Sequence, residues 1–599
     1  MVRRVAILCA LAAAAPVSAQ TGLTPLSDLG TGTYQGFQGG LYPTGVNHPP
    51  VAHFRAAVAR AAEIVPRNAA GAPDPQGFIA MIAVGMSNTT HEFGAFERNA
   101  DLSGNRNARL VLMDTGQGGQ TAAIIADPAA AYWTTMTQRL TAMGLTAAQV
   151  QVAWLKEADA GPPNDFPGHA TVLRDELELV VQNLHDKFPN LKLCYLSSRI
   201  YGGYSQQGTL NPEPQAYESG FSVKWLIEDQ IAGDPGLSYG QVDGPVRAPL
   251  LLWGPYLWAD GPSPRSDGLT WQIGDLENDH VHPSPSGEEK VAGLLAAFFA
   301  ADATSARWWR ARDDVGLATV DAIKDAHVSG GSPGTNFGSV SPLLEQGGAA
   351  PFTPYLGFSV TSVARPVLSA KLSLRVLANG GGRVSTASDT SWGEGTITFA
   401  NAPPIGSLVT NLPNSSRDGT LAAAVTATVN ADADGALTYV LSTPATGQAS
   451  YHSKEAGAAP RLVLVVSCAA SADGDGDGRG DPCDCAPADG TAFALPGEVA
   501  HLRWLDAATL AWDPQASTAG SGTTYDLTSG DLTSLPTFAP DAGDVCVGSA
   551  LIPSQVLDAG PAPLPGSGRY FLVRAADACG SSRWETSSDG RERGSVICP

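Results

Sequence analysis

The sequence has few basic residues and few cysteines, and it lacks a hydrophobic run long enough to cross a bilayer. Its 599 residues include 36 Lys and Arg against 58 Asp and Glu, which gives a net charge of -22. Nucleic acid and anionic membrane surfaces repel so acidic a chain, so neither is expected as a partner. The apolar stretch Val5–Ala15 is shorter than the roughly 20 residues that a membrane-spanning helix needs, so we expect no membrane insertion.

The first 19 residues have the pattern of a secretory signal. Arg3 and Arg4 precede the apolar stretch, and the small residues at 17–19 fit a cleavage site before Gln20. We therefore expect a secreted, extracellular protein whose mature chain is soluble and monomeric. A hydrophobic content of 43% is enough for packed cores, and the length favours roughly three to five domains.

The cysteines are distributed unevenly. Cys194 stands alone in the apolar run Leu191–Leu196, which predicts a buried free thiol rather than a nucleophile. The other six that follow the signal all lie in the last quarter: Cys468, Cys483, Cys485, Cys546, Cys579 and Cys598. An even number in an exported, loop-rich region predicts three disulfides, although the sequence does not choose among the possible pairings.

Residues 76–305 alternate between strand-like and helix-like runs, after a Gly- and Pro-rich N-terminal extension at 20–75 with one expected helix. The strand-like runs are Phe78–Val84, Leu110–Met113, Gln151–Leu155, Leu191–Leu196 and Pro249–Trp253. The helix-like runs are Pro128–Met143, Ala170–Phe188, Gln215–Ile231 and Ser286–Phe299. This alternation is typical of a doubly wound α/β domain, in which helices cover both faces of a parallel sheet.

The pattern changes after residue 312. Residues 315–467 are rich in Ser, Thr, Val, Gly and Asn and contain short alternating runs, such as Arg461–Val466. Helical periodicity is nearly absent, which predicts an all-β sandwich. A short acidic segment occupies 468–486, and strand-and-turn patterning at 494–599 predicts a second, smaller β domain. The fold class expected is therefore multidomain, with one α/β domain followed by two all-β sandwiches.

Three residues in two short segments carry the chemistry expected of the α/β part. Ser87 follows the first strand-like run, and Asp279 and His282 precede the last helix-like run. A serine hydroxyl needs a base to take its proton, and the base needs an acid to orient it. The carboxyl ends of parallel strands share one sheet edge, so we expect Ser87 as nucleophile, His282 as base and Asp279 as orienter to meet there.

These segments resemble the SGNH, or GDSL-like, hydrolase family over roughly residues 76–300. Its Gly-Asp-Ser block is matched by Gly85-Met86-Ser87, and its late Asp-x-x-His block by Asp279 and His282. The resemblance implies a flavodoxin-like fold and hydrolysis of acyl esters, often acetyl groups on polysaccharides, without a catalytic cofactor. His280 is a rival base, but it lies one strand period out of phase with the family motif.

The same resemblance implies an oxyanion hole. The segment Asp114–Thr121 fits the family's glycine block, with Gly119 as the first candidate donor, Gly116 as the second, and the Ser87 amide as a further donor. The family's third block carries Asn or Gln, whereas this chain has Lys156-Glu157. Lys156 can donate to an oxyanion and Glu157 cannot, so Lys156 is the expected donor, the alternative being that both only pair with neighbours.

Residues 315–467 resemble the DNRLRE-type sandwich, a carbohydrate-binding-module-like domain. The resemblance is carried by Asp325–Val328, Ser332–Gly338, Tyr355–Phe358, Ser391–Glu394, Asn401–Pro403 and Ser453–Ala456. It implies binding of a glycan or polysaccharide, with a structural spacer as the alternative. In the α/β part, aromatics that could line a sugar cleft or belong to the core are Tyr201, Tyr204, Trp253, Tyr256 and Trp258.

The acidic segment has the spacing of a calcium loop. Oxygen ligands recur at the EF-hand positions in Asp473, Asp475, Asp477, the Arg479 carbonyl, Asp481 and Asp484. With Cys483 and Cys485 beside it, the run resembles a thrombospondin type 3 repeat, which implies structural calcium; an acidic linker is the alternative. Residues 494–599 resemble a fibronectin type III-like domain, and attachment or spacing is its expected role.

Two functions follow from these patterns. The first is a secreted serine esterase that removes acyl, in particular acetyl, groups from a carbohydrate and carries a glycan-binding module and a calcium site. The second is a calcium-dependent extracellular adhesin or glycan-binding protein whose hydrolase-like domain is inactive. The altered third block favours the second function, while the intact Ser, His and Asp set favours the first.

Overall fold

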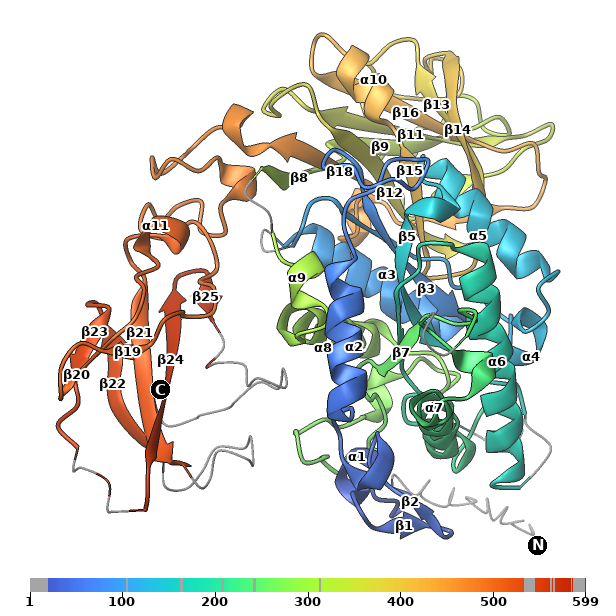
Figure 1. The fold of residues 1–599 in the computed structure, drawn as a ribbon. Coiled ribbons are helices and arrows are strands. Elements are labelled where there is room, and N and C mark those ends of the chain that lie inside the picture. Colours follow the sequence, from blue (N-terminus) through green and yellow to red (C-terminus); the bar gives the residue numbers. More distant parts are fainter. Residues whose placement is uncertain are drawn as a thin grey trace, which may run out of the picture.

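The structure, a computed structural model, describes residues 20–103, 106–161, 165–205, 210–240, 244–311, 314–532, 544–560, 563, 566–582, 584 and 598. The predicted secretory signal lies outside these residues, as do parts of the last predicted domain. None of the helices within the described ranges combines the length and apolar character needed to cross a membrane. Figure 1 shows an α/β domain, a β-sandwich packed on it, and a further β domain that includes the C-terminal end.

The α/β domain is built on five parallel strands in the order β4-β3-β5-β6-β7. The strands are β3 (Ile79–Gly85), β4 (Leu110–Met113), β5 (Val150–Lys156), β6 (Leu193–Leu196) and β7 (Leu250–Trp253). All residues of β3, β5, β6 and β7 are buried, as expected when helices cover both faces of a sheet. The order is the flavodoxin-like one, so the predicted doubly wound α/β fold class is confirmed.

Helices lie on both faces of this sheet (Figure 1). They are α2 (Val51–Ala62), α3 (Ser87–Asp101), α4 (Ala122–Ile125), α5 (Ala131–Ala142), α6 (Gly168–Lys187), α7 (Gln215–Ala232), α8 (Pro285–Ala301) and α9 (Ala306–Trp309). Helix α3 packs against α8, and α6 packs against α7. The start of the chain, with α1 (Leu26–Leu29), β1 (Thr33–Tyr34) and β2 (Phe37–Gln38), also adds Leu26, Leu41 and Tyr42 to the core of this domain.

The middle part of the chain is a two-sheet sandwich, which confirms the all-β prediction for it. One sheet has the order β10-β17-β12-β18-β8 with β15 paired to β12, and the other β14-β13-β16-β11-β9. The elements are β8 (Val315–Asp321), β9 (Lys324–Ser329), β10 (Leu343–Glu345), β11 (Phe352–Ser359), β12 (Ser369–Ala378), β13 (Gly380–Ala387), β14 (Ile405–Ser415), β15 (Thr420–Ala424), α10 (Thr426–Ala431), β16 (Ala436–Ser442), β17 (Ala449–Tyr451) and β18 (Arg461–Ser467).

The last part of the chain has a three-stranded sheet, β19-β20-β23, and a four-stranded sheet, β22-β21-β24-β25. Its elements are β19 (Arg503–Trp504), β20 (Thr509–Ala511), α11 (Ala516–Ala519), β21 (Thr524–Asp531), β22 (Val545–Leu551), β23 (Gln555–Leu557), β24 (Arg569–Asp577) and β25 (Gly580–Ser581). Three disulfides join Cys468 to Cys483, Cys485 to Cys579 and Cys546 to Cys598, while Cys194 is free and buried. The predicted number of disulfides is confirmed.

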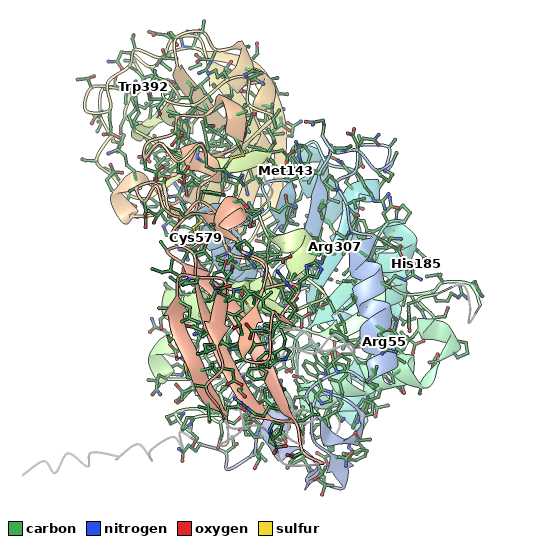
Figure 2. All side chains as sticks on the ribbon, turned by 60° about the vertical axis from the view of Figure 1, so that its left-hand side comes forward. Arg55, Met143, His185, Arg307, Trp392 and Cys579 are labelled. Carbon is green, nitrogen blue, oxygen red and sulfur yellow. A yellow bond between two sulfur atoms is a disulfide. The ribbon has the colours of Figure 1, made fainter. Side chains whose placement is uncertain are left out.

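The sandwich is held on the α/β domain by buried ion pairs. Lys371 of β12 contacts Glu97 at 2.8 Å and Asp101 at 2.6 Å, both on α3. Arg375, four residues further along β12 and on the same face of the strand, contacts Glu288 of α8 at 2.9 Å. Figure 2 shows Met143, at the end of α5, close to the sandwich, and α5 also packs against β14 and β15. Since these charges are buried and paired across the two domains, losing either partner would leave an uncompensated charge at the interface.

Candidate active site

The turn between β3 and α3 presents Ser87 at the first residue of a helix. Gly85, the last residue of β3, has φ of +152°, and a Cβ at this position would lie 2.1 Å from the carbonyl oxygen of Lys156. Only glycine fits so close an approach of two strands. The chain then enters α3 directly, so Ser87 sits where the unpaired N–H groups of the helix N-terminus stabilise negative charge.

The three residues expected to carry the chemistry form one hydrogen-bonded chain. The Ser87 Oγ lies 2.8 Å from the His282 Nε2, and the His282 Nδ1 lies 2.6 Å from the Asp279 Oδ2. The other carboxylate oxygen of Asp279 accepts the backbone N–H groups of Val281 and His282. Partial burial of Asp279 is outweighed by its hydrogen bonds from the backbone and ring of His282, so its pKa falls to about 2.

The histidine segment is locked to the nucleophile helix. The Asn88 side-chain amide, next to Ser87, donates to the Val281 carbonyl at 3.0 Å. His280, the rival base, has a left-handed backbone with φ of +57°. Among the described residues, the Ser87 hydroxyl is hydrogen-bonded to His282 and not to His280. The arrangement is therefore that of a nucleophile, a base and an orienting acid.

The glycine-rich loop after β4 lies beside Ser87. A Cβ on Gly118 would be 3.7 Å from the Ser87 Cβ, and Gly119 has φ of +75° with open space around it. The Gly116 amide already donates to Asp114, which makes it the weaker of the two candidate donors. Gly119 stays the predicted donor, and Gly118 is a neighbour that the sequence reasoning did not single out.

Lys156, the other predicted oxyanion donor, is in a buried ion pair. Its Nζ lies 2.5 and 2.6 Å from the two carboxylate oxygens of Glu92 on α3. Burial lowers the pKa of Lys156 to about 8 against the opposing charge of Glu92, and burial raises the pKa of Glu92. The pair joins α3 to the end of β5, where Lys156 lies opposite Gly85 in the sheet register. Glu92 carried no sequence signal, because a glutamate in a helix is usually exposed.

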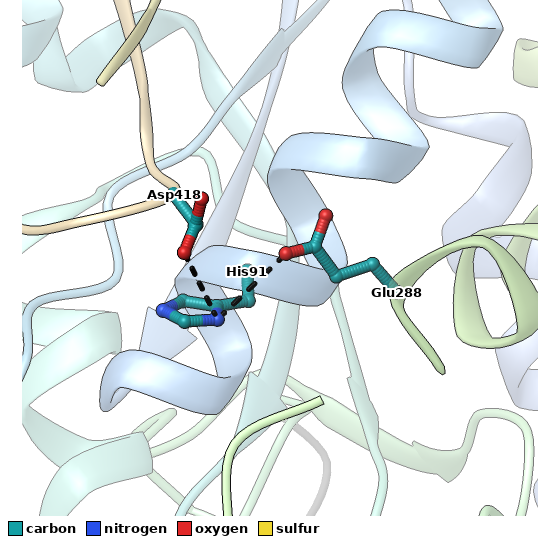
Figure 3. Close-up of side chains that lie close together, drawn as sticks. All are labelled: His91, Glu288 and Asp418. Carbon is teal, nitrogen blue, oxygen red and sulfur yellow. Dashed lines mark ion pairs between the residues drawn. The ribbon is translucent and has the colours of Figure 1, made fainter. Parts of the chain in front are cut away.

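A second histidine lies behind the first. The rings of His91 and His282 stack with centroids 5.3 Å apart. Within the part of the chain that the structure describes, the His91 Nδ1 has no hydrogen-bond partner; it lies 3.8 Å from Glu288 and 3.9 Å from Asp418, a residue of the sandwich (Figure 3). Burial, reinforced by the charge of His282, lowers the pKa of His91 to about 3, so this ring stays neutral.

The trio of His91, Glu288 and Asp418 has ligand atoms close enough to hold a metal ion. Arginines already contact its carboxylates, however: Arg375 lies 2.9 Å from Glu288, and the Arg417 Nε lies 3.0 Å from Asp418. These cations supply the positive charge that a metal would bring, so the trio is better described as an ion-pair network behind the catalytic histidine.

The five aromatic residues that could have lined a sugar cleft belong to the core. Their exposed fractions range from 0 to 7% in Tyr201, Tyr204, Trp253, Tyr256 and Trp258. Side chains this buried offer no stacking face to a sugar ring. The sequence left open whether these residues line a sugar cleft or belong to the core, and their burial shows that they belong to the core.

The acidic segment brings its first three aspartates together. Asp473, Asp475 and Asp477 have carboxylate oxygens within 4.8 Å of one another. One carboxylate oxygen in each of Asp475, Asp477 and Asp484 is buried and finds no hydrogen-bond partner among the described residues. Burial and the neighbouring carboxylates raise the pKa of Asp484. The Cys468–Cys483 disulfide closes a loop around most of the segment.

Comparisons with known proteins bear on the sandwich most directly. Residues 316–466 match the model of carbohydrate-binding module family 96, which supports a carbohydrate-binding sandwich here. A search of curated proteins found no match. Because the family model covers only this part of the chain, it leaves the α/β domain unassigned.

Similar solved structures are distant. A protein from Bacillus subtilis is 12% identical, covering 38% of this chain and 57% of that one, with a TM-score of 0.22. A gut microbial diltiazem-metabolizing enzyme is 13% identical, covering 48% and 58%, with a TM-score of 0.23. A novel carbohydrate acetylesterase from Xanthomonas citri is 9% identical, covering 64% and 78%, with a TM-score of 0.20. The alignments thus span less than two thirds of the first two proteins, and these scores are too low to carry a functional argument.

Proposed function

We propose that this chain is a secreted serine esterase that removes acyl groups, in particular acetyl groups, from a carbohydrate. The observation that carries the proposal is the continuous hydrogen-bonded chain from Asp279 through His282 to the Ser87 hydroxyl. The SGNH-like order of the segments along the chain agrees with it. No metal or organic cofactor has a step in the proposed reaction, because the three side chains and the backbone amides account for each proton and charge.

In the proposed mechanism, the Ser87 Oγ attacks the ester carbonyl while His282 takes the hydroxyl proton. Asp279 stays ionised and holds the imidazolium that forms. The Ser87 amide at the helix N-terminus and the Gly119 amide stabilise the oxyanion. His282 then returns the proton to the leaving sugar hydroxyl, and a water molecule, activated by the same histidine, releases the acid from Ser87.

The carbohydrate part of the proposal is supported by the family match of the sandwich. A module of this kind would keep the enzyme on a polymeric glycan and raise the local concentration of ester groups. Under this proposal the partner is a glycan, and the protein acts outside the cell as a monomer.

The alternative is an extracellular, calcium-dependent glycan-binding protein or adhesin whose α/β domain is inactive. The observation that favours it is Lys156, which replaces the family's third-block residue and pairs with Glu92. The two functions differ in one measurable property, since only the esterase turns over an ester.

The test is hydrolysis of p-nitrophenyl acetate by the purified full chain, with Ser87→Ala and His282→Ala as active-site variants. Either change should lower kcat by about 10⁴-fold or more, because each removes a member of the triad. The matched control is His280→Asn, which tolerates the left-handed backbone and should keep wild-type kcat. A fluorophosphonate probe should label the wild type and not Ser87→Ala. Wild-type protein that neither turns over nor labels would favour the inactive alternative.

We also propose that the acidic segment binds structural calcium. The ligands would be Asp473, Asp475, Asp477, the Arg479 carbonyl, Asp481 and Asp484, following the spacing of an EF-hand loop. The clustered carboxylates with unpartnered buried oxygens support this assignment, because close like charges need a cation.

A further inference from the structure

We propose that one turn of the sandwich positions two loops of the active site in the α/β domain. These are the glycine-rich loop after β4 and the loop that carries Asp279 and His282. The segment is Asn414–Thr420, which comprises the last two residues of β14, the connection 416–419 and the first residue of β15, and it is called the interdomain turn below. The proposal deepens the esterase function and depends on it. It makes the sandwich a required half of the catalytic unit, in addition to any role in holding a glycan.

The first contact is with the glycine-rich loop that carries the oxyanion donor. The Thr420 amide donates to the Asp114 carboxylate at 3.1 Å, and the other oxygen of this carboxylate accepts the Gly116 amide at 3.1 Å. Arg139 completes a clamp, since its guanidinium donates to the carbonyls of Asp114 and Gly116 and, at 3.0 Å, to the carbonyl of Asn414. Two hydrogen-bonded paths therefore run from the interdomain turn into this loop.

The turn also reaches the surroundings of the nucleophile. A Cβ on Gly118 would lie 3.5 Å from the Ser416 Cβ and 3.7 Å from the Ser87 Cβ, so Gly118 is held between the two serines. The Ser416 hydroxyl is buried and has no hydrogen-bond partner among the described residues. The wall of the site beside Gly118 is thus supplied by the sandwich.

The second contact is with the histidine loop. Arg417 donates to the Glu277 carboxylate at 2.6 Å, and the Glu277 amide donates to the His282 carbonyl at 2.8 Å. Asp418 lies 3.9 Å from His91, whose ring stacks on that of His282. The turn is therefore connected to His282 indirectly by two routes, through Glu277 to its backbone and through His91 to its ring.

This close approach depends on two glycines. A Cβ on Gly94, in the middle of α3, would lie 3.2 Å from the Thr420 Oγ1 and 3.3 Å from the Asp418 carbonyl. A Cβ on Gly419 would lie 3.0 Å from Thr90 and 3.2 Å from the Asp114 carboxylate. Side chains at either position would push the turn away from α3, and the contacts with both catalytic loops would lengthen.

A merely tethered module and a built-in one differ in which kinetic constant they change. A tethered module raises the local concentration of polymer and leaves the turnover of a small soluble ester unchanged. A turn that positions catalytic groups changes kcat on every substrate, since a small misplacement of these groups costs up to about 10²-fold. A small ester with no sugar therefore separates the two roles.

The experiment uses the full chain with Arg417→Ala, Arg417→Lys and a control, Arg461→Ala, which removes another sandwich arginine whose ion pair with Asp321 lies between β18 and β8. On p-nitrophenyl acetate, Arg417→Ala should lower kcat about tenfold with KM unchanged, because the histidine loop loses a support. Arg417→Lys should recover most of the loss, and Arg461→Ala should match the wild type. Wild-type kcat in Arg417→Ala, or an equal loss in the control, would overturn the proposal.

A second measurement does not need activity. Hydrogen exchange should rise in segment 277–284 of Arg417→Ala and stay unchanged in Arg461→Ala, since only the first variant releases the histidine loop. Unchanged exchange in segment 277–284 of Arg417→Ala would reject the positioning role. An inactive wild type with raised exchange in Arg417→Ala would instead reject the esterase function and keep the structural coupling, so the two failures are distinguishable.

Discussion

At the scale of single residues, the site divides into groups that react and groups that hold them. In the proposed mechanism Ser87 and His282 exchange the proton, and Asp279, whose Oδ2 lies 2.6 Å from the His282 Nδ1, orients the imidazole. Lys156 and Glu92 are buried nearby and bonded to each other. This pair links β5 to α3, so it can support the turn that carries Ser87. The role of Lys156 as oxyanion donor stays a prediction.

Asp279→Asn should lower kcat by about 10⁴-fold, because an amide cannot hold the imidazole in the tautomer that accepts the serine proton. The pKa of Asp279 falls to about 2. Its ionised form therefore contributes in full to folding stability at pH values above the ordinary carboxyl pKa, and this contribution is lost only as the pH falls through about 2. The acid limb of the wild-type kcat profile above pH 3 should therefore have the slope of one ionisation. A slope of two would mean that Asp279 titrates there as well.

Lys156 can be tested without leaving an unpaired charge. Lys156→Ala alone should destabilise the fold by about 3–5 kcal/mol, because it strands the buried carboxylate of Glu92. The double variant Lys156→Met with Glu92→Leu should restore most of the melting temperature. If Lys156 donates to the oxyanion, the double variant loses about 10²-fold in kcat. Wild-type kcat in the restored protein would make Lys156 a structural residue.

At the scale of elements, α3 connects the nucleophile to the sandwich. It begins at Ser87 and its buried polar residues face two directions, with Glu92 toward β5 and Glu97 and Asp101 toward Lys371 of β12. A helix so polar would ordinarily face solvent. Here the sandwich covers it, and Gly94 provides the room for that contact.

The two helix glycines Gly94 and Gly293 offer a matched comparison. Glycine to alanine within a helix normally stabilises by about 1 kcal/mol. Gly293→Ala on α8 should show this gain, because no atom lies within 4 Å of its added methyl group. Gly94→Ala should show no gain and should lower kcat, because its methyl group meets the interdomain turn. Equal gains in melting temperature with unchanged kcat would contradict this account of α3.

Asp114 gives the same interface a pH dependence. Burial, against the opposing charge of Arg139, raises its pKa to about 7. The neutral form of Asp114 is thus preferred in the folded state. Its contribution to the free energy of unfolding is complete below about pH 4 and is lost as the pH rises through 7. In calorimetry, Asp114→Asn should gain melting temperature relative to the wild type between pH 5 and pH 8. The control is Asp321→Asn, which removes an exposed carboxylate of the sandwich, and a parallel drift in both variants would rule out Asp114 as its source.

At the scale of the whole molecule, covalent links tie the acidic segment to its neighbours on both sides. One disulfide joins Cys483 to Cys468 at the end of the sandwich, and another joins Cys485 to Cys579 in the last domain. The segment also packs against β8, where a Cβ on Gly316 would meet the carbonyl of Pro482. Ordering this segment would therefore set the orientation of the last domain.

Removal of calcium should act on this junction and not on catalysis. With EDTA, the carboxylates lose their cation and repel, so protease sensitivity at residues 468–490 should rise and the melting temperature should fall. Hydrolysis of p-nitrophenyl acetate should be largely retained, because the triad lies in another domain. EDTA saturated with calcium is the control. Unchanged proteolysis, or no calcium binding in calorimetry at millimolar concentration, would leave the segment as an acidic linker.

The sequence by itself determined the features that depend on local pattern and on order along the chain. Apolar periodicity located the five parallel strands and four of the long helices, because burial on both faces leaves continuous hydrophobic runs. It also located the segments of Ser87, Asp279 and His282, since the carboxyl ends of such strands meet at one edge. The free buried Cys194 and the number of disulfides followed from composition and spacing alone.

Only the tertiary structure decided which surfaces meet. The pairing of the disulfides, the burial of Glu92 against Lys156, and the core position of Trp253 and its aromatic neighbours depend on distances across the fold. The position of the interdomain turn beside Ser87 brings together residues more than 300 apart in sequence, such as Asp114 and Thr420. No local pattern encodes such a contact, because periodicity tells which side of an element is buried and not what buries it.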